Sequence, residues 1–108
     1  MRGMHIKTWC NSIHKWAHEK GFYEEPHSVP CKHRSGGIPG SLMLIVSELS
    51  EALEADRNEN RELFCEEIAD TAIRLFDLCS AEGIDLEERI KKKMAKNWQR
   101  PFRHGKAY

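Results

Sequence analysis

The chain has 108 residues, with 17 acidic and 17 basic side chains and a formal net charge of zero. This length predicts a single domain, spanning 1–108, with a small core. A zero net charge gives no support for a nucleic-acid polymer as partner, and the longest apolar run, residues 42–46, is far too short to span a membrane. The first residues lack the apolar segment of a signal peptide. We therefore expect a cytoplasmic protein without a membrane partner.

The charges are distributed unevenly along the chain. Residues 41–88 hold fourteen of the seventeen acids but only three bases, whereas residues 89–108 hold eight Lys or Arg and no acid. An acidic centre next to a basic end suits a metal cluster beside a polyanion site. Charged helix faces that pair with each other in solvent explain the same distribution equally well.

The first element in chain order is an amphipathic helix over residues 5–20. Its apolar side chains recur at helical spacing, and Gly21 is a typical stop signal. They are Ile6, Trp9, Cys10, Ile13, Trp16 and Ala17. Phe22 and Tyr23 follow as an aromatic pair that needs a core or a ligand to cover it. Residues 24–40, with three prolines and three glycines, predict a loop.

Three further helices are predicted after this loop. The second covers residues 41–58, and the third begins between residues 58 and 61 and ends before Gly83. The fourth begins at Asp85, an N-cap acid with Glu88 three residues later, and ends near Trp98, followed by a basic tail at 101–108. No strand-like alternation occurs, so we predict an all-α protein, a four-helix bundle.

The third predicted helix is apolar over more than half of its circumference. A chain of 108 residues offers too few partners for such a helix, so we expect helices from another subunit to complete the bundle. The cysteines form no CxxC pair. Three of them lie among apolar residues at helical spacing and are interpreted as small core residues in a reducing compartment. These three are Cys10, Cys65 and Cys79.

Two acidic pairs dominate the central helices. They are Glu48-Leu-Ser-Glu51 in the second helix and Glu67-Ile-Ala-Asp70 in the third. A spacing of three places both carboxylates of a pair on one helix face, and both pairs lie beside apolar stripes. Four carboxylates brought together repel one another unless a cation lies between them, and oxygen ligands suit Mg²⁺ or Mn²⁺. A pair of solvated helix acids remains the alternative for each motif taken alone.

The combined pattern resembles the MazG-type all-α nucleoside triphosphate pyrophosphohydrolases. ExxE on one helix and ExxD on the next are followed by Lys93-xxx-Asn97-xx-Arg100-Pro101. The resemblance extends over nearly the whole chain through the segments IHKWAHEKGF, LMLIVSELSEALEADR, EEIADTAIRLFDLC, GIDLEERIKKKM and KNWQRPFRHG.

This resemblance implies an Mg²⁺-dependent hydrolase that cleaves (deoxy)nucleoside triphosphates to monophosphate and pyrophosphate as a homodimer or homotetramer. The implied Mg²⁺ ligands and catalytic residues are Glu48, Glu51, Glu67 and Asp70. Spacing does not distinguish the general base among them; Glu51 is the working choice. A role in cleansing the nucleotide pool would follow, with stress signalling as the other possibility.

The resemblance also implies contacts to the nucleotide. Lys93, Asn97 and Arg100 correspond to phosphate and sugar contacts, and their spacing places them along one face of the fourth helix; a solvated basic face is the alternative. His14 and Tyr23 correspond to base-binding positions, against the alternatives of a partly buried polar residue and core packing. At Arg74 some relatives carry an aromatic residue. Here the arginine could pair with Asp70 or Glu67, or reach the ligand.

Two other functions compete with this interpretation. A di-iron carboxylate bundle needs Glu-x-x-His on its helices, and the one such motif, from Glu24 to His27, is broken by Pro26. A non-catalytic helical oligomerisation module, in which the acids line an interface between subunits, remains open.

Overall fold

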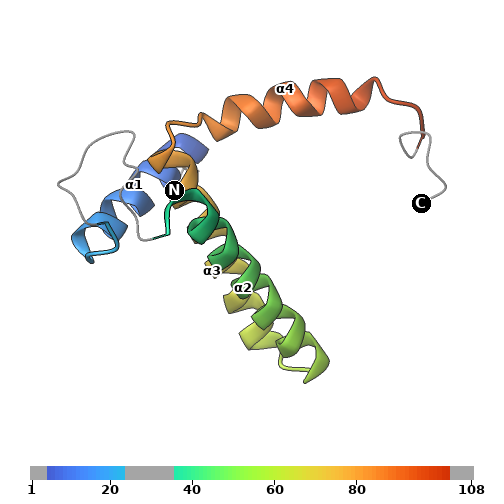
Figure 1. The fold of residues 1–108 in the computed structure, drawn as a ribbon. Helices are drawn as coiled ribbons and strands as arrows, with labels where there is room; N and C mark the ends of the chain where they lie inside the picture. Colours follow the sequence, from blue (N-terminus) through green and yellow to red (C-terminus); the bar gives the residue numbers. More distant parts are fainter. Residues whose placement is uncertain (1–4, 24–35, 103–108) are drawn as a thin grey trace.

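Four α-helices make up the computed structural model, which describes residues 5–23 and 36–102 (Figure 1). The helices are α1 (Ile6–Glu19), α2 (Gly37–Arg57), α3 (Arg61–Ala81) and α4 (Leu86–Trp98). No β-strand occurs within these two ranges, so the all-α prediction with four helices is confirmed. Most of the predicted loop and most of the basic tail lie outside the described residues.

The start of α2 corrects the sequence prediction. The helix begins at Gly37, whereas the prediction had a loop up to Gly40. Pro39 lies in the first turn, where a missing N–H costs no helical hydrogen bond. Gly36 precedes the helix at φ 81°, and a Cβ on it would lie 3.1 Å from the Cα of Gly40. The glycines and the proline thus build a helix start instead of excluding one.

Side-chain caps fix where α3 and α4 begin. The Asn60 side-chain oxygen accepts a hydrogen bond from the backbone N–H of Leu63 at 3.1 Å. Asp85 accepts one from the backbone N–H of Glu88, also at 3.1 Å, so the predicted N-cap of the fourth helix is confirmed. Each cap satisfies a donor that has no partner inside the helix.

Substitution Asn60→Ala is expected to lower the free energy of unfolding by about 1 kcal/mol, because the first turn of α3 loses its side-chain acceptor. Asn60→Asp keeps an acceptor in place and should stay close to wild type. Urea unfolding followed by circular dichroism measures both variants. Equal losses for the two substitutions would contradict a capping role for Asn60.

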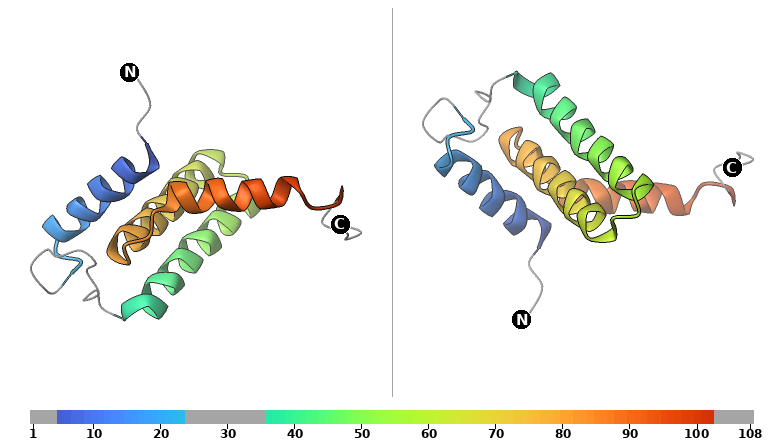
Figure 2. Two further views of the ribbon diagram at one scale, coloured as in Figure 1. Left: turned by 90° about the horizontal axis from the view of Figure 1, so that it is seen from above. Right: turned by 90° about the horizontal axis from the view of Figure 1, so that it is seen from below.

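α2 and α3 form an antiparallel helical hairpin joined by a short turn, and α1 packs on α3 (Figures 1 and 2). α4 contacts α1, where Glu87 accepts a hydrogen bond from the backbone N–H of Ile6 at 3.2 Å. Beyond this contact α4 extends away from the hairpin, as Figure 1 shows. The four helices of one chain therefore do not close into a bundle.

The buried core consists mainly of small side chains. Its apolar members are Cys10, Ala17, Tyr23, Ala52, Ala55, Cys79 and Ala81. Cys65 is exposed on α3, so its assignment to the core was wrong, whereas Cys10 and Cys79 are buried as predicted. The two tryptophans of the predicted α1 stripe, Trp9 and Trp16, are about half exposed. One chain therefore covers only part of the apolar surface that its sequence provides.

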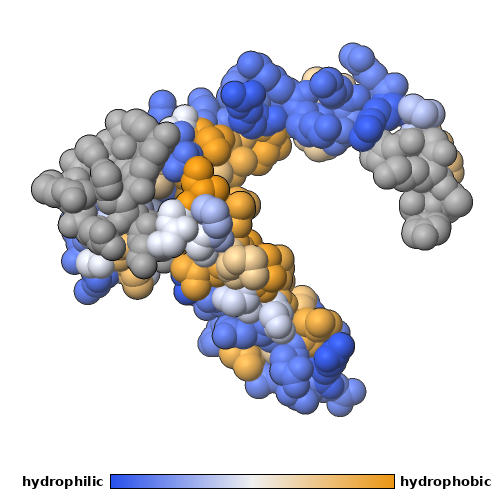
Figure 3. All heavy atoms as spheres, viewed as in Figure 1, coloured by the Kyte–Doolittle hydropathy of each residue, from blue (hydrophilic) through white to orange (hydrophobic). Residues whose placement is uncertain are grey.

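Large apolar side chains remain exposed on all four helices. On α2 they form a stripe, defined by Leu42, Met43, Val46, Leu49 and Leu53. Others lie on α3 and α4, and Trp98 is 83% exposed. Figure 3 shows hydrophobic residues gathered on the concave side between the hairpin and α4. The radius of gyration is 16.3 Å, against about 13 Å for a compact domain of this length.

Among the described residues, no helix has the length and apolar character needed to cross a membrane.

Candidate functional site

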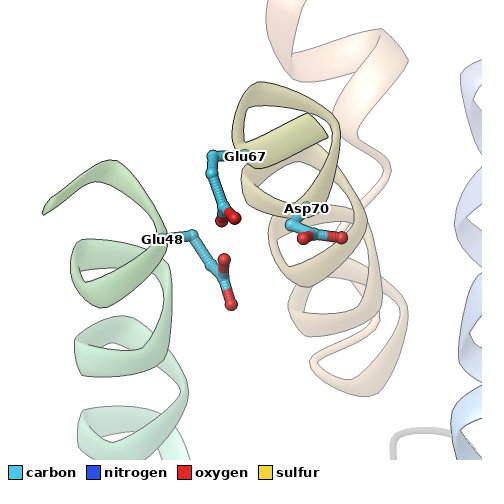
Figure 4. Close-up of side chains that lie close together, drawn as sticks. All are labelled: Glu48, Glu67 and Asp70. Atoms are coloured by element: carbon cyan, nitrogen blue, oxygen red, sulfur yellow. The ribbon is translucent and has the colours of Figure 1, made fainter. Parts of the chain in front are cut away.

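Three carboxylates from two neighbouring helices meet in the middle of the α2–α3 hairpin. Glu48 of α2 and Glu67 and Asp70 of α3 each offer one oxygen, and these three oxygens lie within 4.8 Å of one another (Figure 4). The spacing of three in Glu67 and Asp70 puts both on the face of α3 that meets α2. We call these three residues the acidic cluster. Such a set of anionic oxygens is the ligand type that hard divalent cations prefer.

Two members of the acidic cluster are removed from solvent. Glu48 is 8% exposed and Glu67 is 9% exposed, whereas Asp70 lies at the surface. The Oε2 atom of Glu67 is buried and accepts no hydrogen bond from the described part of the chain. A buried carboxylate oxygen without a donor is costly unless a proton or a cation reaches it. The lack of a hydrogen-bond partner for this buried oxygen is the observation that fits a bound metal most directly.

The two buried acids, Glu48 and Glu67, shift each other's pKa in opposite directions. Hydrogen bonding with Glu48, followed by burial and by the nearby Glu51, raises the pKa of Glu67 to about 7. The contact with Glu67 lowers the pKa of Glu48 in turn; the Arg74 guanidinium also lowers it, and burial acts in the opposite direction. Without a metal and below a pH of about 7, the pair therefore shares one proton, and the raised pKa places that proton on Glu67.

Glu51, the fourth predicted ligand, has a different environment. It is exposed on α2 and is not part of the three-oxygen group, although it is near enough to raise the pKa of Glu67. The structure thus brings three of the four predicted acids into one group and leaves Glu51 beside it. Its role as a ligand or as general base stays a prediction.

A cleft of about 150 Å³ opens beside the acidic cluster. It lies between α1, α2 and α3 and combines acidic, basic and aromatic side chains. Its lining consists of Trp16, Phe22, Glu48, Asp70, Ile73, Arg74 and Asp77. The rings of Trp16 and Phe22 have their centroids 5.7 Å apart, and each side chain is about half exposed. The two rings are tilted by 47° to each other, so the cleft offers an aromatic wall next to the carboxylates.

The predicted base-binding residues lie in a buried network. The Nδ1 atom of His14 is 2.8 Å from one carboxylate oxygen of Asp77, and the Tyr23 hydroxyl donates to the other at 2.6 Å. His14 is 1% exposed, and Tyr23 is buried as well. Their rings meet edge to face with centroids 4.8 Å apart. Both therefore support the wall of the cleft through Asp77, and a direct contact to a base stays a prediction.

The predicted phosphate-binding residues lie elsewhere. Lys93 and Asn97 are on α4 and Arg100 follows it, in the part of the chain that extends away from the hairpin (Figure 1). None of the three lines the cleft. Within one chain, the structure does not bring them to the acidic cluster.

Sequence reasoning did not identify Trp16, Ile73 and Asp77 as cleft residues and left the partner of Arg74 undecided. The prediction placed Trp16 in the apolar stripe of α1. It did not single out Asp77, because the residues on either side of Asp77 in the sequence are apolar. The signal for Asp77 was its spacing, because Asp70, Arg74 and Asp77 follow one another on one face of α3. Arg74 pairs with Glu48, at 2.9 Å between its Nε and Oε1 of Glu48, instead of with Asp70 or Glu67.

Comparison with protein-family models, with curated proteins and with solved structures gave no match.

Proposed function

We propose that this chain is an Mg²⁺-dependent nucleoside triphosphate pyrophosphohydrolase. The observation that carries the proposal is the acidic cluster, whose three carboxylate oxygens lie within 4.8 Å of one another beside a cleft with an aromatic wall. The candidate ligand atoms are all carboxylate oxygens, and Glu67 has a buried oxygen, Oε2, that accepts no hydrogen bond from the described residues. This donor set fits Mg²⁺ or, as a substitute, Mn²⁺.

The proposed reaction cleaves the bond between the α and β phosphates. A bond forms between a water oxygen and the α phosphorus, and the bond from that phosphorus to the bridging oxygen breaks. The products are a nucleoside monophosphate and pyrophosphate. When bound, Mg²⁺ would neutralise phosphate charge and activate the attacking water.

The residues of the chain would divide the remaining work. Glu48, Glu67 and Asp70 would hold the metal, and Glu51, which lies outside the three-oxygen group, would accept the proton of the water. Trp16 and Phe22 offer their rings to the nucleobase, with His14 and Tyr23 holding the wall behind them through Asp77. Reaction by water attack requires no nucleophilic side chain.

The proposed enzyme works as a homodimer or homotetramer. The stripe on α2 and the apolar residues of α4 are exposed in one chain, and burying them against a second copy would complete a MazG-like bundle. The basic α4 of one copy would then approach the acidic hairpin of another. Lys93, Asn97 and Arg100 would reach the triphosphate in this way. We propose that the enzyme acts in the cytoplasm and that its role is to cleanse the nucleotide pool.

Purified protein is expected to release pyrophosphate from one or more members of a panel of ribo- and deoxyribonucleoside triphosphates when Mg²⁺ is present. Excess EDTA should abolish the release, and added Mg²⁺ should restore it, because the acidic cluster then regains its cation. Light scattering on the same sample should give a mass of at least two chains.

The alternative function is a non-catalytic oligomerisation module whose acids line the interface. The extent of exposed apolar surface favours this alternative as much as it favours an oligomeric enzyme. A folded oligomer that releases no pyrophosphate from any nucleotide, with Mg²⁺ or Mn²⁺, would contradict the enzyme proposal and support the module.

A further inference from the structure

Arg74 supplies the one positive charge in direct contact with the acidic cluster among the described residues. Its Nε donates to Oε1 of Glu48 at 2.9 Å, and its side chain is 32% exposed. Glu48 is nearly buried, so this charge-assisted hydrogen bond is partly shielded from water. Without a metal, Arg74 thus neutralises one carboxylate of the cluster.

The position of Arg74 on α3 lets it serve the cleft as well as the cluster. Asp70 lies four residues before it and Asp77 three residues after it, so all three share one helix face. The side chain of Arg74 lines the cleft with Trp16 and Phe22. A guanidinium at this place needs only a change of side-chain rotamer to leave Glu48 and point into the cleft, and its solvent-exposed third leaves room for that movement.

Arg74 neutralises the cluster only in part. It contacts Glu48, whereas Oε2 of Glu67 is buried and receives no hydrogen bond from the described chain. A divalent cation among the three oxygens would balance the charge of Glu67 and would compete with Arg74 for the carboxylate of Glu48. The carboxylate of Glu48 then faces two cations, and the divalent ion attracts it more strongly than the single charge of the guanidinium.

We propose that Arg74 is an exchangeable countercation: it holds Glu48 in the metal-free protein, leaves it when a divalent metal binds, and then contacts a phosphate of the nucleotide in the cleft. This inference rests on the proposed function, because it assigns Arg74 a role at that same site. The planar guanidinium suits both partners, since it binds a carboxylate or a phosphate with the same fork of N–H donors.

The test measures binding without turnover. Calorimetric titration of nucleotide-free protein with Mg²⁺ is expected to show about fivefold tighter binding for Arg74→Gln than for wild type, because the competing cation is gone. Titration with inorganic pyrophosphate at saturating Mg²⁺ is expected to show binding weakened by about fivefold or more, because the phosphate contact is lost. Circular dichroism confirms that the variant remains helical.

The matched control is Arg57→Gln, which removes an arginine from an exposed pair with Glu54 at 3.9 Å, a contact remote from the cleft. It should leave both affinities unchanged. Arg74→Lys, a second variant that keeps the charge without the fork, should bind Mg²⁺ like wild type and pyrophosphate more weakly.

Two failures are distinguishable. If wild-type protein binds no Mg²⁺, the proposed function itself is contradicted. If wild type binds Mg²⁺ but Arg74→Gln binds it with equal or lower affinity, the metal site stands and the exchange is wrong, because Arg74 then supports the metal ligands instead of competing with the metal. Unchanged pyrophosphate binding in Arg74→Gln would overturn the phosphate contact.

Discussion

Glu67→Gln is expected to reduce pyrophosphate release at least about 100-fold while the helical structure is retained. Replacing a residue that only orients a metal ligand already lowers metal affinity or activity about 10- to 100-fold, so replacing a ligand itself should lower activity at least as much. A glutamine has the shape of a protonated glutamic acid but lacks the negative charge that a metal requires. It can also donate to Glu48, as the protonated Glu67 does in the metal-free protein.

The same substitution should leave the metal-free protein at least as stable as wild type. The folded state raises the pKa of Glu67 from an ordinary 4.5 to about 7. Between these pH values the folded chain keeps a proton that the unfolded chain has lost, so the stability of the wild type falls as the pH rises, and this contribution is lost above a pH of about 7. The glutamine of the variant has no proton to lose, so this decline should disappear.

Glu66→Gln is the matched control for this experiment. Glu66 is the neighbouring acid on α3, is exposed, and does not belong to the acidic cluster. It should keep wild-type turnover and wild-type stability. Asp70→Asn tests the third ligand and should lose turnover like Glu67→Gln. Normal pyrophosphate release by either cluster variant would remove that residue from the metal site.

Mg²⁺ affinity is expected to rise about tenfold for each unit by which the pH increases toward about 7, and to level off above it. Below a pKa of about 7, one proton occupies the pair formed by Glu48 and Glu67, and Mg²⁺ must displace it. Above this pH the pair is already ionised and no proton competes. The sign follows from the raised pKa of Glu67: acid stabilises the protonated, metal-free form.

Calorimetric titrations with Mg²⁺ at about pH 6, 7 and 8, in buffers of different ionisation enthalpy, measure both the affinity and the number of protons released. Binding of Mg²⁺ should release close to one proton per site at the lowest pH and almost none at the highest. An affinity independent of pH across this range would show that Glu67 does not bind the metal.

Local signals in the sequence were sufficient for much of the fold. Helical periodicity located the four helices within a few residues, and the Asp85 cap was found from its spacing to Glu88. The start of α2 was misjudged because proline and glycine were read as breakers, although their place in the first turn decides what they do. The prediction that Cys65 is a core residue failed for another reason. The helices of one chain do not close into a bundle, so α3 does not bury every residue on its apolar side.

The candidate site was predicted only in outline. The spacings in Glu48-Leu-Ser-Glu51 and Glu67-Ile-Ala-Asp70 indicated which acids share a face, but not which of them reach the other helix. Packing of α2 on α3 buries Glu48 and leaves Glu51 exposed, although both belong to the same motif. The MazG-type resemblance supplied further residues, of which those on and after α4 are not near the cluster in one chain.

By itself, the sequence determined the local features of this protein: the helices, the N-cap of α4, and the presence of paired carboxylates on neighbouring helices. These depend on residues a few positions apart, which interact in the same way wherever the helix lies. Only the tertiary structure decided that Arg74 pairs with Glu48 and that His14 and Tyr23 meet at Asp77, 63 and 54 residues away along the chain. Such contacts depend on how helices dock, and spacing along the chain carries no information about that.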